Sequence, residues 1–178
     1  MAIGTGEAIS GGTRWQYKMI DRRTALKCLT TILIANLVKA KAEASSMSED
    51  GLVTLASKFS VKETLDRLET DLKAKGITVF ARIDHAAGAA SVAMPLRPTK
   101  LLIFGNPKAG TPLMQSNQTI GIDLPLKVLG WEDAEGKVWL TYNDPSWLAR
   151  RHRLGPGTDA SVNGLATTLA NLGKAAAR

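Results

Sequence analysis

Two histidines and their acidic neighbours are the residues whose chemistry could serve catalysis or metal binding. His85 directly follows Asp84 at the end of an alternating apolar segment, and His152 lies in a basic run. Imidazole is a common proton shuttle and metal ligand. If the two histidines converge near Met94 or Met114, a soft metal such as copper becomes plausible. Asp84 and His85 could instead perform acid–base chemistry, or the two histidines could be unrelated polar residues.

A second candidate group lies in the turns that follow an apolar segment. Gly105 and Asn106 end that segment, and a glycine allows a ligand to approach the backbone closely. Thr111 before Pro112 is expected to cap a short helix whose free N–H groups could bind an anion or a carboxylate. An ordinary turn and cap would use the same residues, and the lysine and glycines of a phosphate-binding loop are missing.

Three carboxylates could form an acid–base pair if the fold brings two of them together. These are Asp84, Asp123 and Asp144, although Asp144 before Pro145 is most simply a helix cap. The sequence contains no serine elbow, HExxH motif or dinucleotide fingerprint, so no catalytic residue and no cofactor is assigned. The metal candidates are His85, His152 and Met114. The candidate ligand-binding residues are Asp84, His85, Gly105, Asn106, Thr111, Asp123, Asn143 and Asp144.

The elements that must position these residues form an α+β pattern in the order β-α-β-β-α-β-β-α-α. Ser60 and Glu63 form a capping box, and leucines at helical spacing follow as far as Gly76. We expect one mostly antiparallel sheet with helices packed on one face, and a flexible segment over residues 86–93. The strands are predicted at residues 52–57, 77–84, 100–104, 126–132 and 137–143, and further helices after Thr111, Asp144 and Asp159.

Residues 1–42 are expected to be an export signal. Basic residues precede the apolar run 28–38, and Ala40-Lys41-Ala42 matches a cleavage site. Residues 21–27 resemble the twin-arginine export motif. The apolar run is about half of the roughly 20 residues that a membrane span requires, so no permanent membrane anchor is expected. A cytosolic amphipathic helix is the alternative.

The remaining boundaries follow from this assignment. Met19 is a candidate for the true start, residues 43–51 are expected to be a linker, and residues 52–178 to form one domain. The signal would be removed near Ala42, which places the domain in the periplasm. Cys28, the single cysteine, lies in the leader, so disulfides and cysteine–zinc sites are excluded from the domain.

The charge distribution argues against a nucleic-acid partner. The chain of 178 residues has a net charge of +7 and 44% hydrophobic residues. Residues 1–42 carry seven Lys and Arg against two acids, which is +5, whereas the rest carries 16 against 14, which is +2. A nearly neutral domain gains little affinity from phosphates, and we expect the basic run at residues 150–153 to be a solvated helix end.

Five separated motifs, in the same order, resemble the bacterial domain-of-unknown-function family three-hundred-and-two. The resemblance covers most of residues 52–155. It implies an α+β fold similar to the TATA-binding-protein type and a homodimer, and it implies no reaction. The motifs are ARIDH at 81–85, LIFGNP at 102–107, TPLM at 111–114, IDLPLKVL at 122–129 and GKVWLTYNDP at 136–145.

The sequence therefore predicts an exported periplasmic domain that binds a partner subunit, a small ligand or a metal. The alternatives are a periplasmic enzyme that uses Asp84 and His85, and a purely structural homodimer. A cleft that joins His85, Asn106 and Asp144 would favour binding or catalysis, whereas their dispersal would favour the structural role.

Overall fold

The computed structural model describes residues 46–47 and 50–178, so the predicted export signal and most of the linker lie outside the described residues. The chain divides into two units, residues 1–42 and 43–178, and the fold below is that of the second. None of the helices within the described residues is long and apolar enough to span a membrane.

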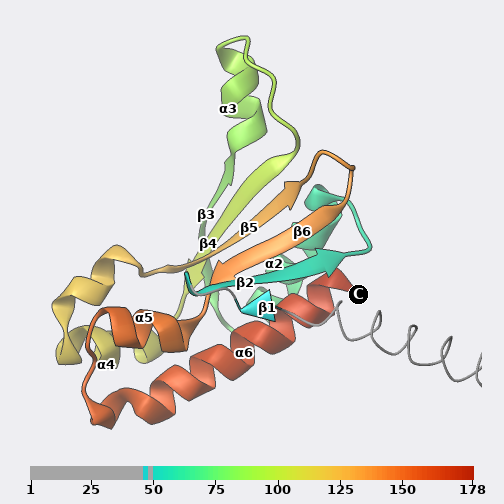
Figure 1. Ribbon diagram of the computed structural model, residues 1–178. Helices are drawn as coiled ribbons and strands as arrows, with labels where there is room; N and C mark the ends of the chain where they lie inside the picture. Colours follow the sequence, from blue (N-terminus) through green and yellow to red (C-terminus); the bar gives the residue numbers. More distant parts are fainter. Residues whose placement is uncertain (1–45, 48–49) are drawn as a thin grey trace, which may run out of the picture. The chain divides into compact units, whose positions relative to one another are not determined.

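One antiparallel sheet forms the body of the domain, with strand order β1-β2-β6-β5-β4-β3 (Figure 1). This confirms the predicted α+β class. Over the described residues the strands are β1 (Ser46–Met47), β2 (Leu52–Ser57), β3 (Thr78–Asp84), β4 (Thr99–Gly105), β5 (Leu126–Glu132) and β6 (Val138–Asn143). The helices are α2 (Val61–Ala74), α3 (His85–Ser91), α4 (Pro107–Ser116), α5 (Pro145–Arg151) and α6 (Asp159–Ala177), with 3₁₀ turns η1 (Gln118–Ile122) and η2 (Pro156–Thr158).

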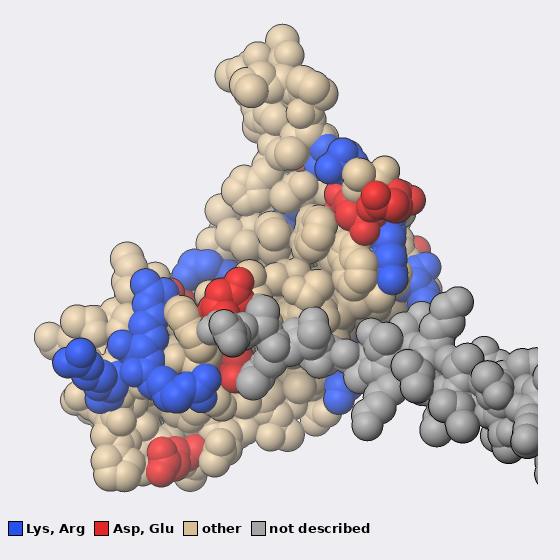
Figure 2. All heavy atoms as spheres, viewed as in Figure 1, with Lys and Arg blue, Asp and Glu red and all other residues tan. Residues whose placement is uncertain are grey.

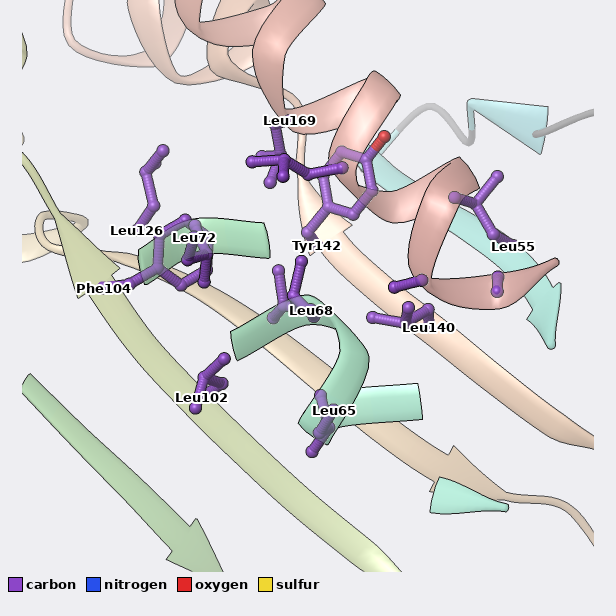
Figure 3. Close-up of a cluster of buried hydrophobic side chains, with 14 of the residues drawn as sticks. Leu55, Leu65, Leu68, Leu72, Leu102, Phe104, Leu126, Leu140, Tyr142 and Leu169 are labelled. Atoms are coloured by element: carbon purple, nitrogen blue, oxygen red, sulfur yellow. The ribbon is translucent and has the colours of Figure 1, made fainter. Parts of the chain in front are cut away.

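Helices α2 and α6 cover one face of the sheet and enclose the main core. The Ser60 hydroxyl caps α2 by accepting from the Glu63 N–H at 3.2 Å, as the capping box predicted. Leu65, Leu68 and Leu72 are then completely buried against the sheet (Figure 3). The leucine stripe of α2 therefore fixes the position of that helix.

The second half of the domain departs from the expected elements at α4. The Asn106 side chain accepts from the Lys108 N–H at 2.9 Å, so the helix begins at Pro107 rather than after Thr111. Asn106-Pro107 is itself a cap followed by a first-turn proline. Pro112 therefore lies inside the helix, and the prediction that Thr111 caps it was wrong.

Two further segments were predicted incorrectly as irregular. Residues 85–91 form helix α3, because the Asp84 carboxylate accepts from the Ala87 N–H at 3.0 Å and the alanines that follow favour a helix. The predicted linker contains β1, whose Ser46 pairs with Thr54 of β2. Both elements are short, and neither has the periodic apolar residues by which a sequence reveals an element.

A β-bulge interrupts strand β3 at Phe80. The register with β4 shifts between Val79 and Ala81, which places one extra residue in β3. Strict alternation would put Arg82 on the face opposite Val79. Instead, Arg82 reaches Asp66 of α2, with 2.5 Å between guanidinium nitrogen and carboxylate oxygen. The bulge thus moves Arg82 to the helix-covered face and leaves Phe80 beside the end of β4.

Candidate functional site

An apolar cavity of about 240 Å³ lies between the end of β4, helix α4 and the segment that leads into β5. We call this the inner chamber. Three of the candidate residues from the sequence, Gly105, Asn106 and Thr111, line it together with Met114. The other lining residues are Phe80, Pro107, Ala109, Gly110, Leu124, Pro125, Leu126 and Leu165.

A larger cavity of about 450 Å³, the outer chamber, adjoins the inner one on the α6 side. Its wall includes α6 and Lys75 at the end of α2. We call the two chambers together the α4–α6 cleft, because five residues line both: Gly105, Asn106, Ala109, Leu126 and Leu165.

Small side chains keep the cleft open. A Cβ atom added at Gly164 of α6 would have no atom within 4 Å, and one at Gly110 of α4 would meet only Leu124, at 3.6 Å. Ala109 in the wall shared by the chambers is also small. Leucines at such positions would fill the space, as they do beneath α2. The cleft is therefore a consequence of residue size at facing positions.

A polar cluster joins η1 to the end of α5 beside this second half of the domain. The Nε2 atom of His152 lies 2.5 Å from Oδ2 of Asp123, and its Nδ1 lies 3.0 Å from the Thr119 hydroxyl. Asn117 donates to the backbone carbonyl of His152 at 2.7 Å. His152 is buried, and both of its ring nitrogens are engaged. The cluster thus fastens η1 to α5.

Asp84 and His85 lie elsewhere, at the base of α3. One carboxylate oxygen of Asp84 caps α3, and the other lies 2.6 Å from the Lys100 ammonium. The hydrogen bond from Lys100, followed by that from the Ala87 N–H, lowers the pKa of Asp84. His85 is exposed. The carboxylate is thus held in its charged form by structural partners.

Asn143 and Asp144 have structural positions as well. The Asp144 carboxylate accepts from the Ser146 N–H at 3.0 Å and caps α5, as predicted. Asn143 ends β6, where it pairs with Leu52. Asp123 meets α5 at its other end, through His152, so the seven-residue helix separates Asp123 from Asp144 by about 10 Å. The fold does not assemble these two carboxylates into an acid–base pair.

The structure therefore splits the predicted site. Gly105, Asn106 and Thr111 share the cleft, whereas His85 begins α3, at the top of Figure 1, and His152 follows α5, at its lower left. In the part of the chain that the structure describes, no three His, Cys, Asp or Glu residues gather as a metal site would require. The joint cleft of His85, Asn106 and Asp144 does not form.

Two residues of the cleft gave no functional signal in the sequence. Lys75 follows the leucine stripe of α2 as an ordinary helix end, and Phe80 lies within an alternating strand. Lys75 reaches the outer chamber because α2 ends beside α6, and Phe80 reaches the inner chamber at the bulge. Both placements depend on tertiary structure, which a local pattern does not encode.

Basic side chains gather over α5 (Figure 2). Arg151 lies 3.4 Å from Asp123, and its guanidinium lies 5.5 Å from the ring centroid of Trp147. Arg150 and Arg151 also occupy the last turn of the helix, where the helix dipole favours positive charge. These contacts account for the basic run as a helix end.

Comparison with known proteins gives one family and a few relatives. Residues 53–174 match the family Domain of unknown function DUF302. Two curated relatives are each 50% identical over 133 residues: "Fluoride-specific ion channel FluC 1" of Brucella suis biovar 1 (strain 1330) and the protein of the same name in Brucella abortus biovar 1 (strain 9-941). The match covers 75% of this chain but 52% and 49% of those proteins. The chain thus spans about half the length of the curated relatives it matches.

A solved structure supports the fold. The chain resembles the crystal structure of an uncharacterized conserved protein DUF302 from Bacillus stearothermophilus, with a TM-score of 0.64 and 20% sequence identity. The match covers 72% of this chain and 98% of that one. At this identity the likeness concerns the fold alone.

Proposed function

Because the chain belongs to the family Domain of unknown function DUF302, whose name assigns no activity, we propose a function from the geometry: the domain binds a small, largely apolar molecule in the α4–α6 cleft. The observation that carries this proposal is the pair of adjoining chambers, of about 240 and 450 Å³. Ligand sites are typically apolar hollows of roughly 300–1,000 Å³ with a few convergent polar groups. Asn106 and Thr111 line the inner chamber, and Lys75 lines the outer one.

The experiment uses the full chain and N-phenyl-1-naphthylamine, an uncharged probe whose fluorescence rises in apolar surroundings. We expect saturable binding by the native protein. Ala109→Phe places a ring in the wall shared by both chambers and should abolish it. Ala134→Phe, in the exposed loop between β5 and β6, adds the same ring away from the cleft and should leave binding unchanged.

Urea unfolding of both variants shows whether Ala109→Phe still folds. Binding that survives in folded Ala109→Phe would contradict the cleft as the site, as would the lack of saturable binding in the native protein.

We also propose that the domain acts in the periplasm after removal of residues 1–42. The cleavage pattern at Ala40-Lys41-Ala42 supports this. Mass spectrometry of the protein from cell fractions should find Glu43 as the N-terminus in the periplasmic fraction. A chain that keeps residues 20–42 and stays in the cytosol would contradict the proposal.

A structural homodimer is the second candidate, and the face of the sheet opposite α2 and α6 favours it. Strand alternation places Leu101 and Leu129 on this face, and Trp131 stacks on Trp139 with ring centroids 6.2 Å apart. Each of these side chains is partly exposed. Apolar surface of this kind is typical of protein interfaces. The dispersal of His85 and the carboxylates also fits a structural role.

Light scattering coupled to gel filtration tests this candidate. The native chain should elute as a dimer, and Leu129→Glu should shift it to a monomer, because the charge would lie within the interface. Glu135→Lys in the exposed hairpin loop is the control and should remain dimeric. A native protein that is still monomeric at a concentration of about 100 micromolar would contradict the dimer.

A further inference from the structure

We propose that the ligand of the α4–α6 cleft is an anionic amphiphile, such as a long-chain carboxylate. Its tail would occupy the inner chamber, and its headgroup would lie near Lys75 in the outer one. This inference rests on the proposed function and adds the chemical class of the ligand.

The two chambers differ in the polarity of their walls. The lining of the inner chamber contains no charged side chain. Phe80, Met114 and Leu124 line this chamber and not the outer one. The outer chamber adds Lys75 and the hydroxyl residues Ser161 and Thr168. A molecule that spans both chambers thus meets an uncharged wall, with Asn106 and Thr111 as its polar residues, at one end, and Lys75, Ser161 and Thr168 among apolar residues at the other.

The charge of the polar end determines the charge of the headgroup. Among the residues that line either chamber in the described part of the chain, Lys75 is the single charged one. The acidic residues Asp66 and Asp71 of α2 line a different hollow, so they do not supply a negative wall to the cleft. A carboxylate is therefore favoured over a neutral or a cationic headgroup.

Helix α6 provides the polar partners along one line. Ser161 and Thr168 are seven residues apart, which is about two helical turns, so they lie on the same side of α6. Leu165 lies between them and lines both chambers. The hydroxyls and the lysine thus border the outer chamber while the leucine marks the passage to the inner one. This arrangement suits a headgroup outside and a chain inside.

The test displaces N-phenyl-1-naphthylamine from the full-length protein with three 12-carbon competitors. These are dodecanoate, dodecanol and dodecyltrimethylammonium, each used below its micellar concentration. We expect dodecanoate to bind tightest. Lys75 is exposed at the border of the outer chamber, so Lys75→Gln should weaken dodecanoate about fivefold, the upper range of a solvent-exposed ion pair, and should leave dodecanol unchanged. Lys58→Gln, an exposed lysine outside both chambers, is the matched control and should change neither.

The outcomes separate this inference from the proposed function. Dodecanol that equals or exceeds dodecanoate overturns the anionic class while cleft binding stands. A preference for dodecanoate that persists in Lys75→Gln also overturns it, because the preference would then arise elsewhere, such as in the basic residues 1–42. If neither the probe nor any competitor binds, both proposals fail.

Discussion

The two halves of the helix-covered face differ in how their space is filled. Beneath α2, Leu65, Leu68 and Leu72 are completely buried against the sheet. Between α4 and α6, the same sheet borders chambers of about 240 and 450 Å³. Strands β4 and β5 contribute to both halves, through Phe104 and Leu126. Leu72, Leu169 and Leu172 border the outer chamber as well, and the space opens where α4 and α6 carry the small residues Ala109, Gly110 and Gly164.

The two halves are also held together by different interactions. Apolar contact dominates beneath α2, whereas the wall of the cleft combines a smaller apolar cluster around Ile120 with the hydrogen bonds of Asp123 and His152. Leu124, the neighbour of Asp123, lines the inner chamber.

The largest effect is expected from truncating a leucine in the packed half. Leu68→Ala should lower the free energy of unfolding by about 2–5 kcal/mol, because it removes buried methyl groups and leaves a cavity. Leu165→Ala, at the cleft, should cost about 1 kcal/mol, because this side chain already borders open space. Urea unfolding, monitored by tryptophan fluorescence, measures the loss of unfolding free energy in both variants. Equal losses would remove the distinction between the halves.

Loss of the Asp123 carboxylate should be the next largest effect. Asp123→Ala leaves the buried imidazole of His152 without one partner and should cost about 1–3 kcal/mol of unfolding free energy. The cleft should then bind N-phenyl-1-naphthylamine more weakly, because η1 keeps the contacts of Asn117 and Thr119 with His152 but loses that of Asp123. Glu135→Ala, in an exposed loop, serves as control in the same unfolding and binding measurements. An unchanged stability in Asp123→Ala would mean that the cluster does not hold the wall.

Alkaline pH should destabilise the packed half through Tyr142. Burial, together with the nearby Asp144 charge, raises the pKa of Tyr142 from 10.0 to about 12. The unfolded chain thus loses this proton first, so stability is complete below pH 10 and falls as the pH rises toward 12, by about 1 kcal/mol between pH 10 and 11. Tyr142→Phe should remove this part of the loss. Absorbance titration at the phenolate band measures the pKa of Tyr142 in the folded protein. A value near 10 would show that water reaches this side chain and would contradict the prediction.

The smallest effects come from a matched pair of glycines in α6. Gly164→Ala should stabilise the protein by about 0.5–1 kcal/mol, because alanine favours a helix and the new methyl group meets open space. At Gly173 a Cβ atom would lie 2.9 Å from Leu55, so Gly173→Ala should destabilise despite the same gain in helix propensity. Thermal unfolding compares the two. Shifts of the same sign would contradict the contrast between packed and open halves.

Periodic sequence patterns predicted the elements of the packed half well. The capping box and leucine stripe located α2, and the alternating strands gave the sheet, because burial imposes those periods. In the open half, the sequence predicted Thr111 as the N-cap of α4, whereas the structure has Asn106 there. The core of this half is a small cluster of Leu113, Ile120 and Val162 from three different elements, so no single segment shows a strong period. The turn residues were the remaining local signal. They singled out Gly105 and Asn106, and both residues line the cleft.

The sequence did not predict the contacts of the site that join distant parts of the chain. Asp123 and His152 were each singled out, but their contact joins residues 29 apart through the placement of η1 on α5. Lys75 carried no signal because its position in the cleft depends on where α2 ends relative to α6. Export and dimerisation remain predictions, since the structure describes neither residues 1–45 nor a second chain.

The bulge at Phe80 has a consequence for how the sheet meets other molecules. Strand β3 is one outer strand of the described sheet, and the bulge breaks the even spacing of its backbone donors and acceptors. The other outer strand, β1, has two residues. Within the described residues, neither border thus offers an added strand a long, regular template. The partly exposed tryptophans on the face of the sheet are thus a separate feature from its borders, where the described backbone disfavours strand addition.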